Sequence, residues 1–583
     1  MMKRRAEEYA GGWNERNVNV QMVGARGIKL KAWSTSLQTG IGGMVALLLL
    51  VVVYQMGPLS GQEAEIRDAL HLMPKVNAPT FNCSELGLKV EKEVVETQHY
   101  HEFRSAATCQ SKLQQHCFRK NTRSEHFPPP KFIALLREYE VYHARCTDAA
   151  VGNLTDLAMA GEVPDGCKYL VWKEMDGMGN QLLSLACAFL YSLLTNRVML
   201  ISRESNMDLY LCNPFPSSSW LLPEDFPEER LRLQACRVFS YLNDTLETVQ
   251  RKYASNFIPP SDLSSFIAAA PRHIHALITC CDSRRDHQFF CPMSQKLFAG
   301  SNWFFYASHE YTLPGFYFIP EFRMKLNDWF PRQDGFMHAV RYLLNPQSDV
   351  WMDIVRFYKE NFDGINRKIG IQARAWEGNY DPSISRQISR CGVEQNLIPR
   401  TMADVSFNPT GATEEEERQE QLIGESHADI SVLVSSLREE YRDDLAKEYH
   451  SHPNVENLTV NVVSASSEHL QQTGDVLHDR KAIIDIWLLS FMDDLVITPR
   501  STFGSTASGM AGIVPLVFIH YGNDNVNEPA CGRTNAVGPC FIIFPREQPC
   551  DLDLPRSSIF DPAQKVPEVK FCDFNLGLGV VNL

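Results

Sequence analysis

Apolar residues recur with two different periods after residue 131, and the two periods predict helices and strands in alternation. The stretch KFIALLREYEVYHARC, residues 131–146, has the spacing of one apolar helix face at Phe132, Leu135, Leu136 and Tyr139. CKYLVW then predicts a buried strand, DGMGN a turn, QLLSLACAFLYSLLTN a helix and RVMLI a second strand. A strand, a helix and a strand in this order predict a parallel βαβ unit.

A second series of the same kind begins near residue 365. KIGIQARAW, ISVLVSSL, VENLTVNVVS and DDLVITP predict four strands, with helices at 439–449 and 480–491. The sequence therefore predicts an α/β fold of two Rossmann-like domains with a cleft between them, at residues 131–360 and 361–550, before a C-terminal extension at 551–583. Ligands of such sheets bind beyond the carboxyl ends of the strands.

The N-terminal region has a different pattern, an uncharged stretch long enough to cross a membrane. Residues 41–54, IGGMVALLLLVVVY, lie within residues 32–62, which carry no charged side chain. A bilayer core of about 30 Å needs about 20 such residues. Basic residues precede the stretch and acidic residues follow it, which predicts a cytoplasmic tail (1–36), a transmembrane signal anchor (37–57) and a stem (58–130). A cleaved signal peptide with an unusually long basic region is the alternative.

Glycosylation sequons and cysteines all follow this stretch. Asparagine in an N-x-S/T sequon occurs at Asn82, Asn153, Asn243 and Asn457, whereas the proline after Asn408 excludes that site. All 16 cysteines also lie after it, which indicates an oxidising lumen. We expect disulfides, in pairs that spacing does not determine, among Cys83, Cys109, Cys117, Cys146, Cys167, Cys212, Cys236, Cys531, Cys540, Cys550 and Cys572.

Composition narrows the class of protein further. The 583 residues are 44% hydrophobic and 22% charged, which are globular values that leave room for two domains and extensions. A formal net charge of -14 excludes broad nucleic-acid binding, because a phosphate backbone requires an excess of Lys and Arg. CxxC and histidine pairs at zinc-finger spacing do not occur, so no structural zinc site is expected.

The stretch DDLVITPRSTFGSTASGMAG, residues 493–512, is the strongest candidate for a ligand site. A predicted strand runs into the small and hydroxylated residues of a glycine-bearing turn, Ser501, Thr502 and Gly504 among them. Backbone amides and hydroxyls in such a turn before a helix form a cradle for phosphate oxygens. The alternative is a turn followed by a closely packed helix of small residues.

Arg374 stands at the end of the predicted strand KIGIQARAW. A guanidinium group there can donate a fork of hydrogen bonds to a diphosphate, or can form a salt bridge with a neighbouring carboxylate. Glu377, Asp381 and Glu394 follow it and are candidate bases by proximity alone. DGMGNQ, residues 176–181, also joins a strand to a helix, and its amides suit either a ligand or a tight turn.

Five motifs in fixed order resemble the plant xyloglucan fucosyltransferase family, the galactoside 2-alpha-L-fucosyltransferases. They are CKYLVWKEMDGMGNQLLSLACAFLYSLLTNRVMLI, CNPFPSSSWLLPEDFP, KIGIQAR, LLSFMDDLVITPRSTFGSTASGMAG and PACGRTNAVGPC. The resemblance, which runs from about residue 131 to the C-terminus, implies a fold of the glycosyltransferase B type. It also implies inverting α-1,2 transfer of L-fucose from GDP-fucose to terminal galactose of a cell-wall glycan, xyloglucan or arabinogalactan. A type II Golgi membrane protein with its catalytic body in the lumen is expected.

The same resemblance implies roles for individual residues. Arg374 matches the arginine of the GIQxR motif and is expected to neutralise the departing diphosphate. The donor site is expected to include Asp485 and the STFG residues Ser501, Thr502, Phe503 and Gly504. The acceptor side is expected at Gly177, Gly179, Asn180, Gln181, His309 and Glu310.

Several positions depart from the family pattern. His309 and Glu310 stand where family members carry Asp and Asn, and Gln181 replaces a common arginine. Arg500 and Ser505 replace aromatic residues that flank STFG. These departures predict an altered acceptor specificity.

No cofactor is expected, since GDP-fucose is a substrate and Arg374 with backbone dipoles supplies the positive field that a metal would otherwise provide. The DLD triplet at residues 551–553 is interpreted as a chance match to a metal-binding motif. A homodimer is compatible with the sequence. An inactive glycan-binding relative and a transferase for another nucleotide sugar are the alternative functions.

Overall fold

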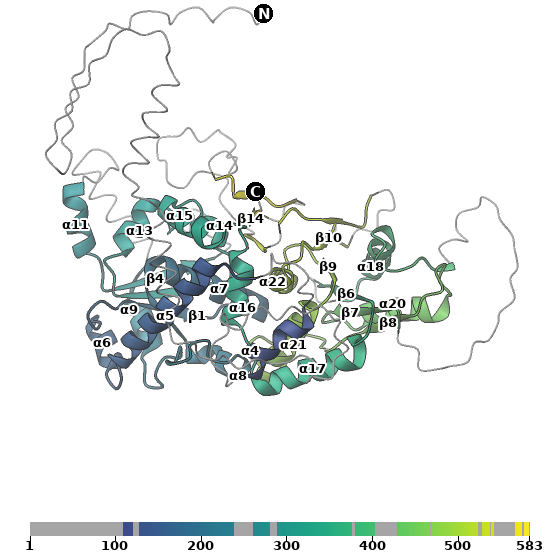
Figure 1. The fold of residues 1–583 in the computed structure, drawn as a ribbon, viewed down its shortest axis with the longest axis horizontal. Helices are drawn as coiled ribbons and strands as arrows, with labels where there is room; N and C mark the ends of the chain where they lie inside the picture. Colours follow the sequence, from purple (N-terminus) through teal and green to yellow (C-terminus); the bar gives the residue numbers. More distant parts are fainter. Residues whose placement is uncertain are drawn as a thin grey trace, which may run out of the picture. The chain divides into compact units, whose positions relative to one another are not determined.

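Two parallel sheets, each covered by helices, form the framework of the protein (Figure 1). The computed structural model describes residues 109–119, 127–237, 260–279, 289–375, 379–402, 428–466, 468–519, 521–522, 528–536, 538–541, 566–573 and 577–581. All of them belong to one compact unit, Ala78–Leu583. The predicted tail and anchor, residues 1–57, and the DLD triplet lie outside the described residues.

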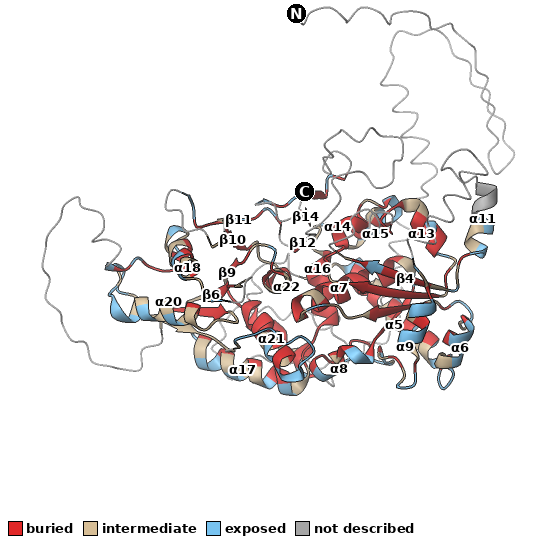
Figure 2. Ribbon diagram, turned by 180° about the vertical axis from the view of Figure 1, so that it is seen from behind, coloured by how far each residue is buried: buried red, intermediate tan, exposed pale blue. Residues whose placement is uncertain are grey.

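The first sheet has five strands in the order β2-β1-β5-β4-β3, and all neighbouring pairs are parallel. Its strands are β1 (Tyr169–Lys173), β2 (Val198–Ile201), β3 (Cys236–Arg237), β4 (His273–Ile278) and β5 (Trp303–Ser308). The two strands predicted in this region are confirmed as β1 and β2. Burial on both faces explains their continuous apolar sequences, because βαβ crossovers cover parallel sheets with helices (Figure 2).

The second sheet has six strands in the order β11-β10-β9-β6-β7-β8, parallel except for the β10–β11 pair. Its strands are β6 (Arg367–Gln372), β7 (Ile430–Ser435), β8 (Val460–Val463), β9 (Asp494–Ile497), β10 (Leu516–Phe518) and β11 (Cys531–Arg533). The four predicted strands are confirmed as β6 to β9. A third, antiparallel sheet contains β12 (Cys540–Phe541), β14 (Leu578–Val580) and β13 (Val569–Phe571).

Helices surround the two parallel sheets. Those of the N-terminal part are α4 (Gln110–Gln114), η2 (Gln115–Phe118), α5 (Pro130–Asp148), α6 (Leu154–Ala160), α7 (Met178–Thr195), η4 (Arg203–Ser205), α8 (Met207–Tyr210), α9 (Glu228–Gln234), α11 (Pro260–Ala268), α13 (Pro292–Phe298), α14 (Leu313–Phe316), α15 (Pro320–Trp329), α16 (Gly335–Leu343) and α17 (Ser348–Phe362). Those of the C-terminal part are α18 (Pro382–Glu394), α20 (Glu440–Ser451), α21 (Val476–Leu489) and α22 (Thr502–Ala511).

Helix α7 is the central core helix of the first βαβ unit. Within the described residues it is the one helix long and apolar enough to cross a membrane, yet 89% of it is buried inside the protein. Its apolar residues belong to a core cluster that also contains Leu170 of β1, Leu433 of β7 and Leu495 of β9. The two sheets therefore share a continuous apolar core, and α7 and α22 lie side by side within it (Figure 1).

The folded body begins earlier in the chain than residue 131, so the predicted stem is too long at its C-terminal end. Cys109 forms a disulfide with Cys212, and Phe118 lies 5.2 Å from Trp351 and 5.3 Å from Phe491 between ring centroids. Most of the buried side chains of residues 109–119 are polar, so the segment shows no apolar periodicity that would have predicted its packing.

Further disulfides join Cys146 to Cys167, Cys391 to Cys531 and Cys540 to Cys572. Cys391 of α18 was not among the cysteines expected to pair, since it lies in a helical stretch of mixed polarity. Its bond to β11 closes 140 residues of sequence. Disulfides therefore tie separate segments together in both halves of the body.

Candidate active site

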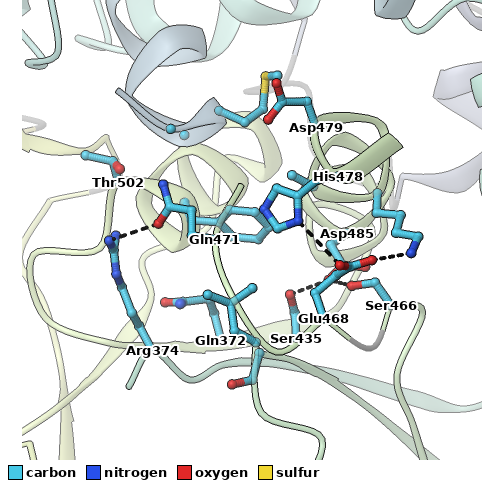
Figure 3. Close-up of a pocket in the computed structure, with 18 of the residues that line it drawn as sticks. Gln372, Arg374, Ser435, Ser466, Glu468, Gln471, His478, Asp479, Asp485 and Thr502 are labelled. Carbon is cyan, nitrogen blue, oxygen red and sulfur yellow. Dashed lines mark hydrogen bonds and ion pairs between the residues drawn. The ribbon is translucent and has the colours of Figure 1, made fainter. Parts of the chain in front are cut away.

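A pocket lies at the carboxyl ends of the strands of both parallel sheets (Figure 3). Gly177 to Asn180 reach it after β1, Gln372 to Ala375 at the end of β6, and Ser435 to Leu437 at the end of β7. The segment between β8 and α21 and the start of α22 complete its wall. This position is where α/β sheets bind ligands, and the sequence predicted it.

The N-termini of α7 and α22 meet at this pocket. Gly177, the N-cap residue of α7, has no side chain with which to cap the helix. Ser501, the N-cap residue of α22, makes no side-chain capping hydrogen bond within the described residues. Met178 and Asn180 of α7 and Thr502 and Phe503 of α22 line the pocket. The amide ends of two helices therefore direct partial positive charge into one cavity, which favours an anion.

Side-chain hydrogen bonds hold the two helix ends together. Thr502 Oγ1 donates to Asn180 Oδ1 at 2.6 Å, across 322 residues of sequence, and Thr506 Oγ1 lies 3.2 Å from the Gly179 carbonyl oxygen. A Cβ on Gly179 would lie 2.6 Å from the backbone nitrogen of Phe503. Glycine is therefore required at 179 so that the two backbones can approach this closely.

Arg374 follows β6 and lines the pocket. Its backbone N–H donates to Thr498 Oγ1 at 2.9 Å, which fixes the chain as it leaves the sheet, and Nη2 donates to Gln471 Oε1 at 3.4 Å (Figure 3). Burial lowers the pKa of the guanidinium, which nevertheless stays protonated at physiological pH. A fixed cation thus stands beside the two helix N-termini.

Asp485 on α21 is a buried acceptor in the same wall. Its Oδ2 accepts hydrogen bonds from Ser435 Oγ at 2.6 Å and from Ser466 Oγ at 2.8 Å, whereas Oδ1 has no hydrogen-bond partner among the described residues. Burial raises the pKa of this carboxyl to about 6. An unpartnered carboxylate oxygen at a ligand pocket suits a ligand that carries N–H donors.

The segment after β8 contributes residues that sequence reasoning missed. Glu468 is paired with Lys481 and lies 3.6 Å from His478, and Gln471 and Thr473 lie over the pocket opposite Gly177. No periodic pattern or motif marks this loop. The helix that follows begins at Val476 and not at 480, because the Asp475 carboxylate accepts hydrogen bonds from the amides of Leu477 and His478.

The residues of the STFG region serve two purposes. Thr502 and Phe503 line the pocket, whereas Ser501 and Gly504 do not. A Cβ on Gly504 would lie 2.8 Å from Ile497 Cβ, and one on Gly509 would lie 2.5 Å from the Phe336 ring. Gly504 therefore allows α22 to pack on β9, and its expected place beside the nucleotide stays a prediction.

Of the residues expected on the acceptor side, Gly177, Gly179 and Asn180 line the pocket, whereas Gln181, His309 and Glu310 do not. Asn180 Nδ2 donates to the carbonyl oxygen of His309, whose ring Nδ1 lies 2.5 Å from Asp176 Oδ2. Glu310 is buried next to His309, with its Oε1 3.5 Å from His309 Nε2. Gln181 does not line the pocket; its amide donates to the Asp176 carbonyl and closes the turn.

The three carboxylates after Arg374 differ in their surroundings. Asp381 accepts a hydrogen bond from the Ser383 amide and caps α18, so its role here is structural. Glu394 pairs with Arg390 at 3.1 Å and accepts from the Ala530 amide, which also supports structure. Glu377 lies outside the described residues.

Two of the sequon asparagines belong to the described residues. Asn153 and Asn457 are exposed, as an N-linked glycan requires, whereas Asn82 and Asn243 lie outside the described part of the chain.

The family model for xyloglucan fucosyltransferase matches residues 102–550, and the chain belongs to this family. A galactoside 2-alpha-L-fucosyltransferase of Arabidopsis thaliana is 32% identical over 488 residues, covering 81% of this chain and 80% of the relative. The enzyme of the same name from Pisum sativum is 28% identical over 484 residues, covering 82% and 80%. The solved structure of an Arg-to-Lys variant of Arabidopsis thaliana FUT1 in complex with GDP superposes with a TM-score of 0.66 at 28% identity, covering 83% of this chain and 100% of that one.

Proposed function

We propose that this protein transfers L-fucose from GDP-fucose, with inversion, to the 2-hydroxyl of terminal galactose in a cell-wall glycan. Support comes from the relatives named galactoside 2-alpha-L-fucosyltransferase and from the GDP complex of the similar FUT1 structure. The observation that carries the proposal is the convergence of Arg374 and the N-termini of α7 and α22 on one pocket.

This arrangement fits a diphosphate leaving group. As the bond between fucose C1 and the β-phosphate oxygen breaks, its electron pair remains on that oxygen and negative charge grows there. Arg374 and the helix amides lie in place before the reaction, so they stabilise this charge without reorganisation. The acceptor hydroxyl attacks C1 from the opposite face, forms the new C–O bond and gives up its proton to a base.

Asp485 fits the guanine end of the donor. Guanine presents an N1–H and a 2-amino group side by side, and both are donors. The unpartnered Oδ1 of Asp485 offers a buried acceptor in the same pocket. Adenine carries no hydrogen on N1 and no 2-amino group, so this carboxylate would select guanine nucleotides.

The acceptor sugar is assigned to the side of the pocket formed by the first sheet, beside Gly177, Asn180 and His309. The disulfides and exposed sequons support a lumenal location for this body, with the N-terminal stretch as its Golgi membrane anchor. Metal-independent transfer follows from the fixed cation and helix ends.

A donor screen tests the proposal. The secreted body is incubated with GDP-fucose, GDP-mannose, UDP-galactose or UDP-glucose, together with galactose-ended xyloglucan or arabinogalactan fragments, and nucleotide release and product linkage are measured. We expect acceptor-dependent GDP release from GDP-fucose alone and an α-1,2-linked product. Turnover with another donor, or GDP binding without any turnover, would replace this function by one of the two alternatives.

A further inference from the structure

The C-terminal end of α22 is held by two arginines that come from distant parts of the chain. Arg119 Nη1 donates to the Met510 carbonyl oxygen at 2.8 Å. Arg341 of α16 donates from Nε to the same oxygen at 3.0 Å and from Nη2 to the Ala511 oxygen at 2.9 Å. Both side chains are buried, with 8% and 4% exposure.

Two buried guanidinium groups at one helix end need a physical reason. Removing a charged group from water is costly, and the last carbonyls of a helix have no partner within the helix. The C-terminal end also carries partial negative charge. Cations that donate hydrogen bonds to these carbonyls therefore satisfy the carbonyls and offset part of their own desolvation.

The opposite end of the same helix forms the anion site. Ten residues of α-helix, Thr502–Ala511, span about 15 Å, so α22 behaves as one short rigid rod. The sides of α22 pack closely against their neighbours. A Cβ would clash at Gly504 and Gly509 of α22 and at Gly179 of the adjacent α7. A rod confined on its sides is free to move mainly along its axis, and the two arginines restrain that movement at the C-terminal end.

Arg119 belongs to a strap, residues 109–119, which is fastened to the first half of the body. The Cys109–Cys212 disulfide ties one end, and Lys112 Nζ donates to the carbonyl oxygens of Asn213 and Pro214 at 2.9 and 3.0 Å. At the other end, the Arg119 guanidinium lies 5.2 Å from the centre of the Phe491 ring. The strap thus connects the first half of the body to α22.

We propose that Arg119 and Arg341 are positioning residues for the donor site. They hold the C-terminal end of α22, so that Thr502 and Phe503 at its N-terminal end stay in place around the diphosphate. This inference rests on the proposed binding of GDP in the pocket. It gives the strap, which precedes the predicted catalytic body, a part in donor binding without any contact to the donor.

Four variants of the secreted body, residues 78–583, test the proposal: Arg341→Met, Arg341→Lys, Arg119→Met and, as a matched control, Lys112→Met. The control loosens the strap at its other anchor and leaves both α22 contacts intact. GDP affinity is measured by calorimetry at least 15 °C below the melting temperature of each variant. The kcat and the KM for GDP-fucose are measured for the same variants. We expect both methionine variants at Arg119 and Arg341 to weaken GDP binding about tenfold, the size of a favourable helix-end interaction, and to raise KM in parallel.

Lys112→Met should lower only the melting temperature, and Arg341→Lys should recover much of the lost affinity because an ammonium group can donate to the same carbonyls. Wild-type GDP affinity in Arg341→Met or Arg119→Met would overturn the proposal, even with a lowered melting temperature. If a methionine variant is not secreted, Arg341→Gln and Arg119→Gln, which lack the charge, replace it, and wild-type GDP affinity in these variants is again the contradicting result. Failure of the wild-type protein itself to bind GDP would instead reject the proposed function.

Discussion

At the scale of single residues, Arg374 carries the chemistry of the proposed reaction. Lysine at this position keeps the charge but loses the planar fork that holds two phosphate oxygens. We expect Arg374→Lys to lower kcat about a hundred- to a thousandfold, the cost of losing one preorganised oxyanion donor. Turnover of GDP-fucose is the measurement, with Arg356→Lys as the control, since Arg356 pairs with Asp353 on the surface of α17. Normal turnover in Arg374→Lys would remove this side chain from the mechanism.

Asp485 makes a residue-scale prediction about pH. Burial raises its pKa from the ordinary 3.8 to about 6, so the folded protein holds a proton that the unfolded chain releases between those values. The ligand-free protein should therefore lose stability as pH rises through this window, while GDP affinity should increase as the carboxylate ionises. We expect Asp485→Asn to weaken GDP binding roughly tenfold at neutral pH and to abolish its rise near pH 6.

The melting temperature of the ligand-free Asp485→Asn variant, measured beside its GDP affinity, separates these two effects. A neutral amide avoids the cost of a buried charge, so neutral-pH stability should equal or exceed that of the wild type. Equal affinity of the wild type for GDP and ADP would contradict the assignment of this residue to guanine.

At the scale of elements, the junction of α7 and α22 makes the sharpest prediction. A Cβ at position 179 would meet the backbone of Phe503 at 2.6 Å, and a backbone cannot move aside without shifting α22. A Cβ at position 177 would instead come closest to a side chain, the amide of Gln471 at 2.5 Å, which can rotate away. Gly179→Ala should therefore cost about 1–3 kcal/mol and weaken GDP binding, whereas Gly177→Ala should melt close to the wild type. Equal behaviour of the two variants in melting and GDP-binding measurements would refute this packing argument.

At the scale of the whole molecule, the electrostatics of the pocket predict metal independence. Arg374 and two helix ends direct positive charge into the pocket, so we expect the proposed diphosphate to be stabilised without a divalent cation. Transferase activity should survive EDTA, which is checked by assaying GDP release before and after chelation. Complete loss of activity that Mn²⁺ restores would show that this field is insufficient.

Topology is the second prediction at this scale. With the body in the lumen, glycosidase treatment should lower the mass of the membrane-bound protein, and protease outside sealed vesicles should remove only the N-terminal tail. Asn153→Gln and Asn457→Gln, at two exposed sequons, should each remove one glycan. Digestion of the body in intact vesicles would place it on the cytoplasmic side.

Several features followed from the sequence by itself. The strands β1, β2 and β6 to β9 and the helices α5 and α7 are marked by apolar runs and spacings, because burial against neighbouring layers leaves a local signature in the chain. Arg374 was identifiable because it directly follows the apolar run of such a strand. The β4 and β5 strands were missed, since a short apolar run does not distinguish a strand from a buried helix.

Only the tertiary structure decided what depends on contacts between distant segments. It separated Thr502 and Phe503, which line the pocket, from Gly504, which packs on Ile497. The sequence of the STFG motif is the same in either case. The tertiary structure also determines that the pKa of Asp485 is raised, because the burial that causes the shift comes from segments remote in sequence. The pairing of Asn180 with Thr502 across 322 residues has the same origin: the distance between two side chains is determined by the packing of whole helices, and no local pattern records it.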